Sequence, residues 1–157
     1  MIETTIREFV SRQELFRDLH TRFLNQLVES ARCRTLAEND ILFRHGDAAD
    51  HFYLLRSGHI TVEIPAIEGP RLEVQKLGPG QVLGWSWLIP PYQWNFQARA
   101  LEESEVVEFD GATIRQQCED DPAFGYEVLK RFSNLMSARL EAARRRMMEE
   151  WKPAGFA

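Results

Sequence analysis

The segment Gly84-Trp85-Ser86-Trp87 begins like the Gly-x-Ser-x-Gly turn that exposes a nucleophilic serine in hydrolases. Leu88 stands where that turn needs its second glycine, and no alternation of strands and helices surrounds it. Gly78-Pro79-Gly80 and Gly84 have the wrong spacing for a dinucleotide-binding loop, and the proline interrupts the pattern. We interpret these glycines as turn residues. The sequence therefore predicts a protein that is not an enzyme.

Histidines are the next candidates, because imidazoles bind metals. Metal sites on cupin-type β-barrels need His-x-His, a nearby Glu and a later His. The four histidines here, His20, His45, His51 and His59, form no such cluster. We predict surface or turn positions for them and no metal. A cupin-like enzyme remains a remote alternative, which an assembled histidine cluster would favour.

Composition limits the remaining function classes. The chain has 157 residues and a net charge of −5, from 19 Lys+Arg against 24 Asp+Glu. An acidic balance argues against non-specific nucleic-acid binding. The chain does not start with positive charges followed by an apolar segment, so we expect no secretory signal, and it has no apolar run of the ~20 residues that a membrane span needs. Two cysteines, Cys33 and Cys118, indicate no disulfide framework, and their redox state stays open. We expect one cytoplasmic domain, residues 1–157, with no membrane partner.

Three regions of that domain would position any site. Residues 11–32 read as a helical lead-in, with a capping box at Ser11 and Glu14 and a division near His20–Thr21. Residues 34–110 read as short strands between glycine turns, and the alternation of Ile60, Val62 and Ile64 predicts a strand with one buried face. Residues 111–151 read as helices. The fold class is α+β, mainly β: an antiparallel, jelly-roll-like β-roll flanked by N-terminal helices and a long C-terminal helix.

The long C-terminal helix carries an apolar stripe of about seven turns. Its members are Leu129, Phe132, Met136, Leu140, Ala143 and Met147. A partner helix is one explanation, so we predict a homodimer through this helix; a helix folded back along the roll is the other. The basic run Arg144-Arg145-Arg146 precedes Glu149-Glu150, which indicates a solvated face with local ion pairs.

Three ordered motifs resemble the cyclic nucleotide-binding domain family, in particular sensor domains like that of catabolite activator protein. They are Gly46-Asp47-Ala48-Ala49-Asp50-His51-Phe52-Tyr53-Leu54-Leu55-Arg56-Ser57-Gly58, Leu77-Gly78-Pro79-Gly80-Gln81-Val82-Leu83-Gly84 and Ala98-Arg99-Ala100-Leu101-Glu102-Glu103-Ser104-Glu105. The resemblance covers about Leu15 to Ala143. It implies a regulatory sensor with a ligand between the roll and a short helical segment. No helix-turn-helix fits between Trp151 and Ala157, so we expect no DNA binding.

The resemblance also implies a phosphate-binding cassette, where relatives read Phe-Gly-Glu-Leu and then Arg-Ser/Thr-Ala. Alignment places Trp85 at the glutamate and Trp94 near the arginine, and no Lys or Arg lies between Lys76 and Arg99. Arg99 lies one residue off the face of Ala98 and Ala100, so we expect it to point elsewhere. We therefore predict that cAMP and cGMP do not bind in the usual way and that the chain requires no cofactor, although a genuine cAMP-binding protein is one alternative.

The cassette instead holds a dense group of aromatic residues, of which we expect at least two in the core. A pocket for a neutral or aromatic ligand would be formed by Leu83, Gly84, Trp85, Ser86, Trp94, Asn95 and Phe96. A pocket filled by its own indoles, or an exposed patch for a protein partner, would use the same residues. A haem-type ligand is a narrower alternative, which would need a histidine facing a cavity.

Overall fold

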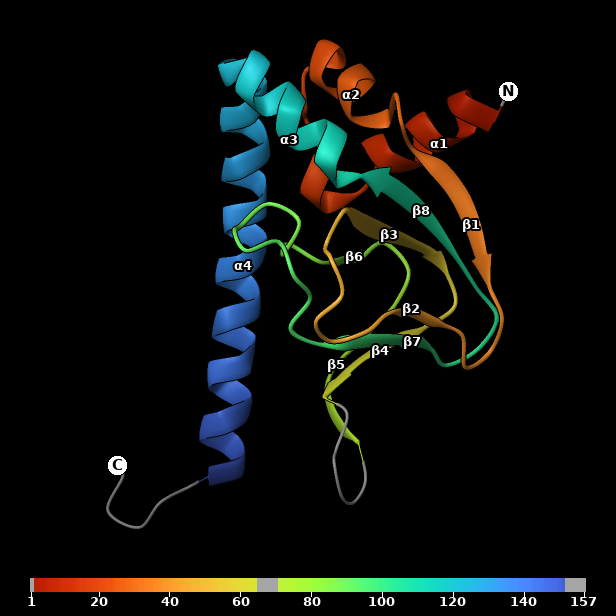
Figure 1. The fold of residues 1–157 in the computed structure, drawn as a ribbon, viewed down its shortest axis with the longest axis vertical. Coiled ribbons are helices and arrows are strands. Elements are labelled where there is room, and N and C mark those ends of the chain that lie inside the picture. The colour runs from red at the N-terminus through yellow and green to blue at the C-terminus, as the bar shows by residue number, and fades with distance from the viewer. Residues whose placement is uncertain (1, 65–70, 152–157) are drawn as a thin grey trace.

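The computed structural model describes residues 2–64 and 71–151 (Figure 1). The N-terminal part contains helix α1 (Ile2–Ser11), the short 3-10 helix η1 (Glu14–Phe16) and helix α2 (Thr21–Val28). The division near His20 is confirmed, because Nδ1 of His20 accepts a hydrogen bond from the Arg22 amide (3.1 Å) and caps α2. The predicted capping box at Ser11 and Glu14 is wrong. Ser11 ends α1, and its hydroxyl donates to the Glu8 carbonyl (2.8 Å), because the chain before it is already helical. The helical lead-in thus begins earlier than residue 11.

In the described residues, eight antiparallel strands form two four-stranded sheets, which confirms the β-roll. One sheet has the order β1 (Arg32–Leu36), β8 (Ser104–Asp110), β3 (His51–Ser57) and β6 (Val82–Leu83). The other has the order β2 (Ile41–Phe43), β7 (Gln97–Ala100), β4 (Ile60–Ile64) and β5 (Leu72–Leu77). The sequence also predicts a loop from Pro65 to Pro70, between β4 and β5, and this segment lies outside the described residues.

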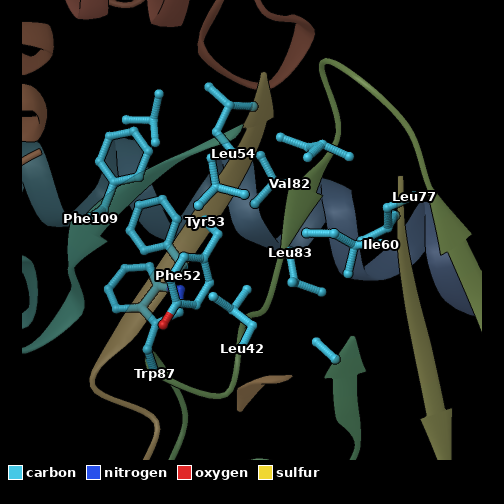
Figure 2. Close-up of a cluster of buried hydrophobic side chains, with 14 of the residues drawn as sticks. Leu42, Phe52, Tyr53, Leu54, Ile60, Leu77, Val82, Leu83, Trp87 and Phe109 are labelled. Atoms are coloured by element: carbon cyan, nitrogen blue, oxygen red, sulfur yellow. The ribbon is translucent and has the colours of Figure 1, made fainter. Parts of the chain in front are cut away.

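The hydrophobic core lies between the two sheets and includes side chains of the flanking helices. Phe52 of β3 stacks on Phe109 of β8 (ring centroids 4.5 Å apart) and on Trp87 (4.7 Å), and Phe132 packs edge-on against both Phe52 and Trp87. Figure 2 shows the rings of Phe52, Trp87 and Phe109 on one side of the core, with the aliphatic Val82, Ile60 and Leu77 on the other. Strand β3 therefore joins the aromatic part of the core to β6, the strand that leads into the cassette.

Strand β4 corrects one expectation. The alternating pattern predicted one buried face, but Thr61 and Glu63 are buried as well, while Ile64 is partly exposed. Both polar side chains have partners: the Thr61 hydroxyl donates to Glu73 (2.6 Å), and Glu63 accepts hydrogen bonds from Gln97 and Arg99. Polar neighbours on β5 and β7 thus cover the face that the pattern assigned to solvent.

Two C-terminal helices complete the fold. Asp110 caps α3 (Gly111–Asp120) by accepting a hydrogen bond from the Thr113 amide (3.0 Å). Helix α4 (Pro122–Trp151) begins at Pro122, directly after Asp120-Asp121, a sequence that predicts a helix start. The first half of α4 packs into the core through Phe124, Val128 and Phe132. The second half continues beside the roll, as Figure 1 shows. No helix in the described part of the chain is long and apolar enough to span a membrane.

Candidate functional site

A cavity of about 550 Å³ lies between the roll and the second half of α4. Its walls come from β2, β4 and β5, from the loop that follows β6, and from α4. All seven residues of the predicted pocket line it: Leu83, Gly84, Trp85, Ser86, Trp94, Asn95 and Phe96. A volume of this size suits a small organic ligand. The cavity is open, so the indoles do not fill the pocket completely. Ligand binding by these residues stays a prediction.

The loop that contributes these residues has no helix. Residues 84–96 consist of turns and a single bridge between Gln93 and Ala48, so the short helical segment implied by the resemblance is not formed. The loop is instead attached to the chain before β3. The Gly46 amide donates to the Trp94 carbonyl (2.7 Å), the Trp94 amide to the Asp47 carbonyl (3.0 Å), and the Ala49 amide to the Tyr92 carbonyl (2.8 Å). Residues 46–49, from the first motif of the resemblance, thus hold residues 92–94 of the cavity loop in place.

Trp94 forms the floor of the cavity. Its side chain is 5% exposed and stacks on Phe43 of β2, with ring centroids 3.7 Å apart and an interplanar angle of 8°. Gly84 has φ +99°, and a Cβ there would overlap the Trp94 ring. The glycine is therefore required twice, for its backbone conformation and for the close approach of the indole.

The other indoles of the loop have different positions. Trp87 is fully buried in the aromatic core, so Trp87 and Trp94 confirm that at least two of the aromatic residues are core. Trp85 is half-buried and lies in the cavity wall, where the Arg139 guanidinium carbon is 5.5 Å from the centre of its ring. Trp85 is thus the indole best placed to contact a ligand.

Arg99 points away from the cavity, as predicted. Its Nε and a terminal nitrogen donate to the two carboxylate oxygens of Glu63 (3.0 and 3.2 Å), and its other terminal nitrogen donates to Asn39 (3.0 Å). Burial raises the pKa of Glu63, but the hydrogen bonds from Arg99 and Gln97 and the nearby positive charges outweigh it and hold this pKa below its usual value. The loop between Leu83 and Phe96 contains no Lys or Arg, and Arg99, which follows it, is paired elsewhere. This part of the chain therefore offers the cavity no positive charge.

Comparisons with known proteins decide the family. A family model of the cyclic nucleotide-binding domain matches residues 33–121, more than half of the chain. The chain belongs to the cyclic nucleotide-binding domain family. A search of curated proteins found no match.

Solved structures confirm the fold of this cyclic nucleotide-binding domain. A putative cyclic nucleotide-binding protein from Geobacter metallireducens is similar at TM-score 0.76 and 24% identity, over 89% of this chain and 98% of that one. A cyclic nucleotide-binding domain from Methylobacillus flagellatus gives TM-score 0.78 and 21% identity, over 94% and 83%. The sensor domain of the transcriptional regulator DNR from Pseudomonas aeruginosa gives 0.71 and 19%, over 88% and 93%.

The positive charges of the cavity come from outside the cassette, and the sequence reasoning missed them. Lys76 of β5 and Arg139 and Arg146 of α4 line the cavity. Arg139 was detectable in principle, because Met136, Arg139, Leu140 and Ala143 are spaced three and four residues apart on one helix face. The basic run behaves as predicted: Arg144 and Arg145 pair with Glu141, and Arg146 pairs with Glu150.

The histidines and cysteines of the domain lie away from this cavity. Among the described residues, no group of three or more His, Cys, Asp or Glu could hold a metal ion. None of the four histidines, all within the described ranges, lines the cavity, so no imidazole is positioned there for a haem iron. His59 instead pairs with Glu102 (2.7 Å). Burial raises the pKa of Cys33, and raises that of Cys118 to about 11, so neither thiol is activated as a nucleophile.

Proposed function

We propose that this domain is a non-enzymatic regulatory sensor whose cavity binds a small ligand with an apolar or aromatic body, and that it does not bind cAMP or cGMP through the usual cassette contacts. The observation that carries the proposal is the open cavity of about 550 Å³ beside a loop without a cation. The similarity to the sensor domain of a transcriptional regulator supports the regulatory role.

The missing cassette charge argues against a cyclic phosphate. Trp85 and Trp94 align with the positions where the resemblance expects a glutamate and an arginine, and an indole offers one N–H donor and no charge. A charge-assisted hydrogen bond contributes roughly 1.5–3 kcal/mol, which corresponds to about tenfold to hundredfold in affinity. The absence of helix at residues 84–96 also removes the ordered N–H groups that favour an anion at a helix start.

The cassette loop is connected to both C-terminal helices, which supports a signalling mechanism. A terminal nitrogen of Arg139 on α4 donates to the carbonyl of Val82 in β6, just before the loop. Arg115 of α3 donates to the Trp87 carbonyl, and its guanidinium lies 4.0 Å from the centre of the Tyr92 ring. A ligand that moves residues 81–96 would therefore change how the roll contacts α3 and α4.

Self-association through α4 is the second part of the proposal. Tyr126, Leu140 and Met147 are 64%, 72% and 56% exposed, and they are spaced by two heptads and one heptad, the repeat by which helices pair side by side. We propose a cytoplasmic homodimer that uses these residues. No DNA-binding role is part of the proposal.

Calorimetric titration tests the ligand site. The probes are cAMP, cGMP and 2-naphthamide, a neutral bicyclic aromatic compound that the cavity can hold. We expect heat from 2-naphthamide and none from the two nucleotides at micromolar concentrations. Sub-micromolar binding of either nucleotide would overturn the proposal. Failure of 2-naphthamide and of similar neutral aromatics up to their solubility would overturn its ligand-binding part.

A further inference from the structure

Three basic residues line the cavity, and two of them, Lys76 and Arg139, form no ion pair among the described residues. Arg99 is paired with Glu63, and Arg146 at the edge of the cavity is paired with Glu150 (3.1 Å) and donates to the Val74 carbonyl (2.9 Å). Arg139 forms no ion pair among the described residues. Its polar contact is the carbonyl of Val82, and its guanidinium also lies over the Trp85 ring. Arg139 is half-buried, whereas Lys76 is exposed, so the positive charge without a counter-charge that faces the largely apolar cavity is that of Arg139.

The surroundings of Arg139 leave its guanidinium half-buried and without a counter-charge. Burial lowers the pKa of the Arg139 guanidinium to about 10, since the group has lost water without gaining a carboxylate. A guanidinium carries five N–H donors, and the Val82 carbonyl cannot satisfy them all. Lys76, the third basic residue of the lining, is exposed, so water rather than the cavity solvates its ammonium group. Arg139 thus remains the group best placed to bind an anion inside the cavity.

We propose that Arg139 binds the carboxylate of an aromatic monocarboxylic acid, whose ring lies against Trp85 and Phe96. This inference rests on the proposed function and names the ligand class for the same cavity. The planar guanidinium matches a carboxylate with two parallel hydrogen bonds. Arg139, the half-buried lining cation without a carboxylate partner, balances one negative charge. The rings of Trp85, Phe96 and Trp94 supply apolar surface for the body of the ligand.

Binding in this way connects two elements of the fold. Arg139 belongs to α4 and contacts Val82 of β6, so a carboxylate on Arg139 adds a second connection between the helix and the loop wall. The ring of the ligand contacts the loop and its charge contacts the helix. The positions of α4 and of the loop therefore both depend on occupancy.

Two ligands of equal shape and different charge test the inference. At about pH 7, 2-naphthoate is ionised and 2-naphthamide is neutral. We expect the wild-type protein to bind 2-naphthoate about tenfold to hundredfold more tightly than 2-naphthamide by calorimetry. Arg139→Gln should remove that preference and leave 2-naphthamide affinity within about twofold of wild type, which also shows that the cavity is intact. Arg139→Lys should retain part of the preference, because it keeps the charge but loses the two-pronged geometry.

Arg145→Gln is the matched control, because Arg145 is an arginine of the same helix that pairs with Glu141 (3.4 Å) and does not line the cavity. It should leave both affinities unchanged. If wild type binds the two ligands equally, or if Arg139→Gln weakens both to the same extent, Arg139 only supports the wall; the inference then fails and the proposed function stands. If neither ligand binds the wild-type protein, both fail.

Discussion

Replacing Trp94 by alanine tests whether this indole supports the cavity or binds its contents. Trp94 is 5% exposed and stacks on Phe43 at 3.7 Å. Removing a buried tryptophan side chain costs about 3–5 kcal/mol. The lower end applies here, because the space that Trp94 leaves opens onto the existing cavity and water can enter it. We therefore expect a loss of about 3 kcal/mol in the free energy of unfolding.

Urea denaturation followed by circular dichroism measures this loss. With a denaturant slope of about 2 kcal/mol per molar, the midpoint should fall by roughly 1.5 M. Trp85→Ala is the control, because Trp85 is half-buried on the same loop and should cost only about 1 kcal/mol. The reasoning is refuted if the Trp94→Ala midpoint stays within about 0.3 M of wild type, or if Trp85→Ala is as damaging.

The same variant separates two reasons for weak cyclic nucleotide binding. If Trp94 merely occupied the space of the phosphate, Trp94→Ala would gain affinity for cAMP. We expect no gain, because the enlarged cavity still lacks a cation on the loop between Leu83 and Phe96. A calorimetric gain of tenfold or more would show that steric filling was the reason.

Two further predictions concern charge and assembly. The pKa of Glu63 is raised by burial but lowered overall by its hydrogen bonds from Arg99 and Gln97, so its pair stabilises the fold above pH 4.5 and loses that effect as pH falls through the lower, folded-state pKa. Glu63→Gln should reduce stability near neutral pH and flatten the acid decline in urea midpoints; an unchanged pH profile would contradict this. Leu140→Glu should reduce the light-scattering mass from twice 18.3 kDa to 18.3 kDa at tens of micromolar, whereas Thr113→Glu, exposed on α3, should not. A wild-type monomer would rule out the dimer.

The elements that sequence predicted well had strong local patterns. Phe52 to Leu55 form a continuous apolar run that became a buried central strand, and Pro122 marked the start of α4. Strand β1 was missed, because Arg32, Cys33, Arg34 and Thr35 are all exposed and show no alternation. It lies at the edge of its sheet and pairs only with β8, where Arg32 and Arg34 contact Glu108 (2.9 and 3.4 Å). Edge strands of this kind are defined by their partners rather than by their own sequence.

At the candidate site, too, local patterns could be predicted, whereas contacts between distant parts of the chain could not. Motifs located the loop that lines the cavity, because glycine spacing is local. Its electrostatics depend on Arg139, which is 57 residues away from its contact Val82 in the chain. Counting charges within the cassette therefore indicated a pocket without a cation, whereas Lys76, Arg139 and Arg146 line the folded cavity, and Arg139 is the half-buried one, on the wall opposite the loop. A helix of 30 residues can bring such a group across because its second half runs along the roll.

The location of that cation determines how a ligand could act. If the roll alone held both the charge and the body of a ligand, binding could leave α4 unaffected. In the proposed binding mode the loop contacts the ring of the ligand while Arg139 of α4 faces its charge, so occupancy would change the free energy of docking α4 on the roll. The same helix carries Leu140, which lines the cavity, is 72% exposed and belongs to the surface through which we propose self-association. Ligand binding and self-association then share one element, and linkage requires each to change the other by the same factor.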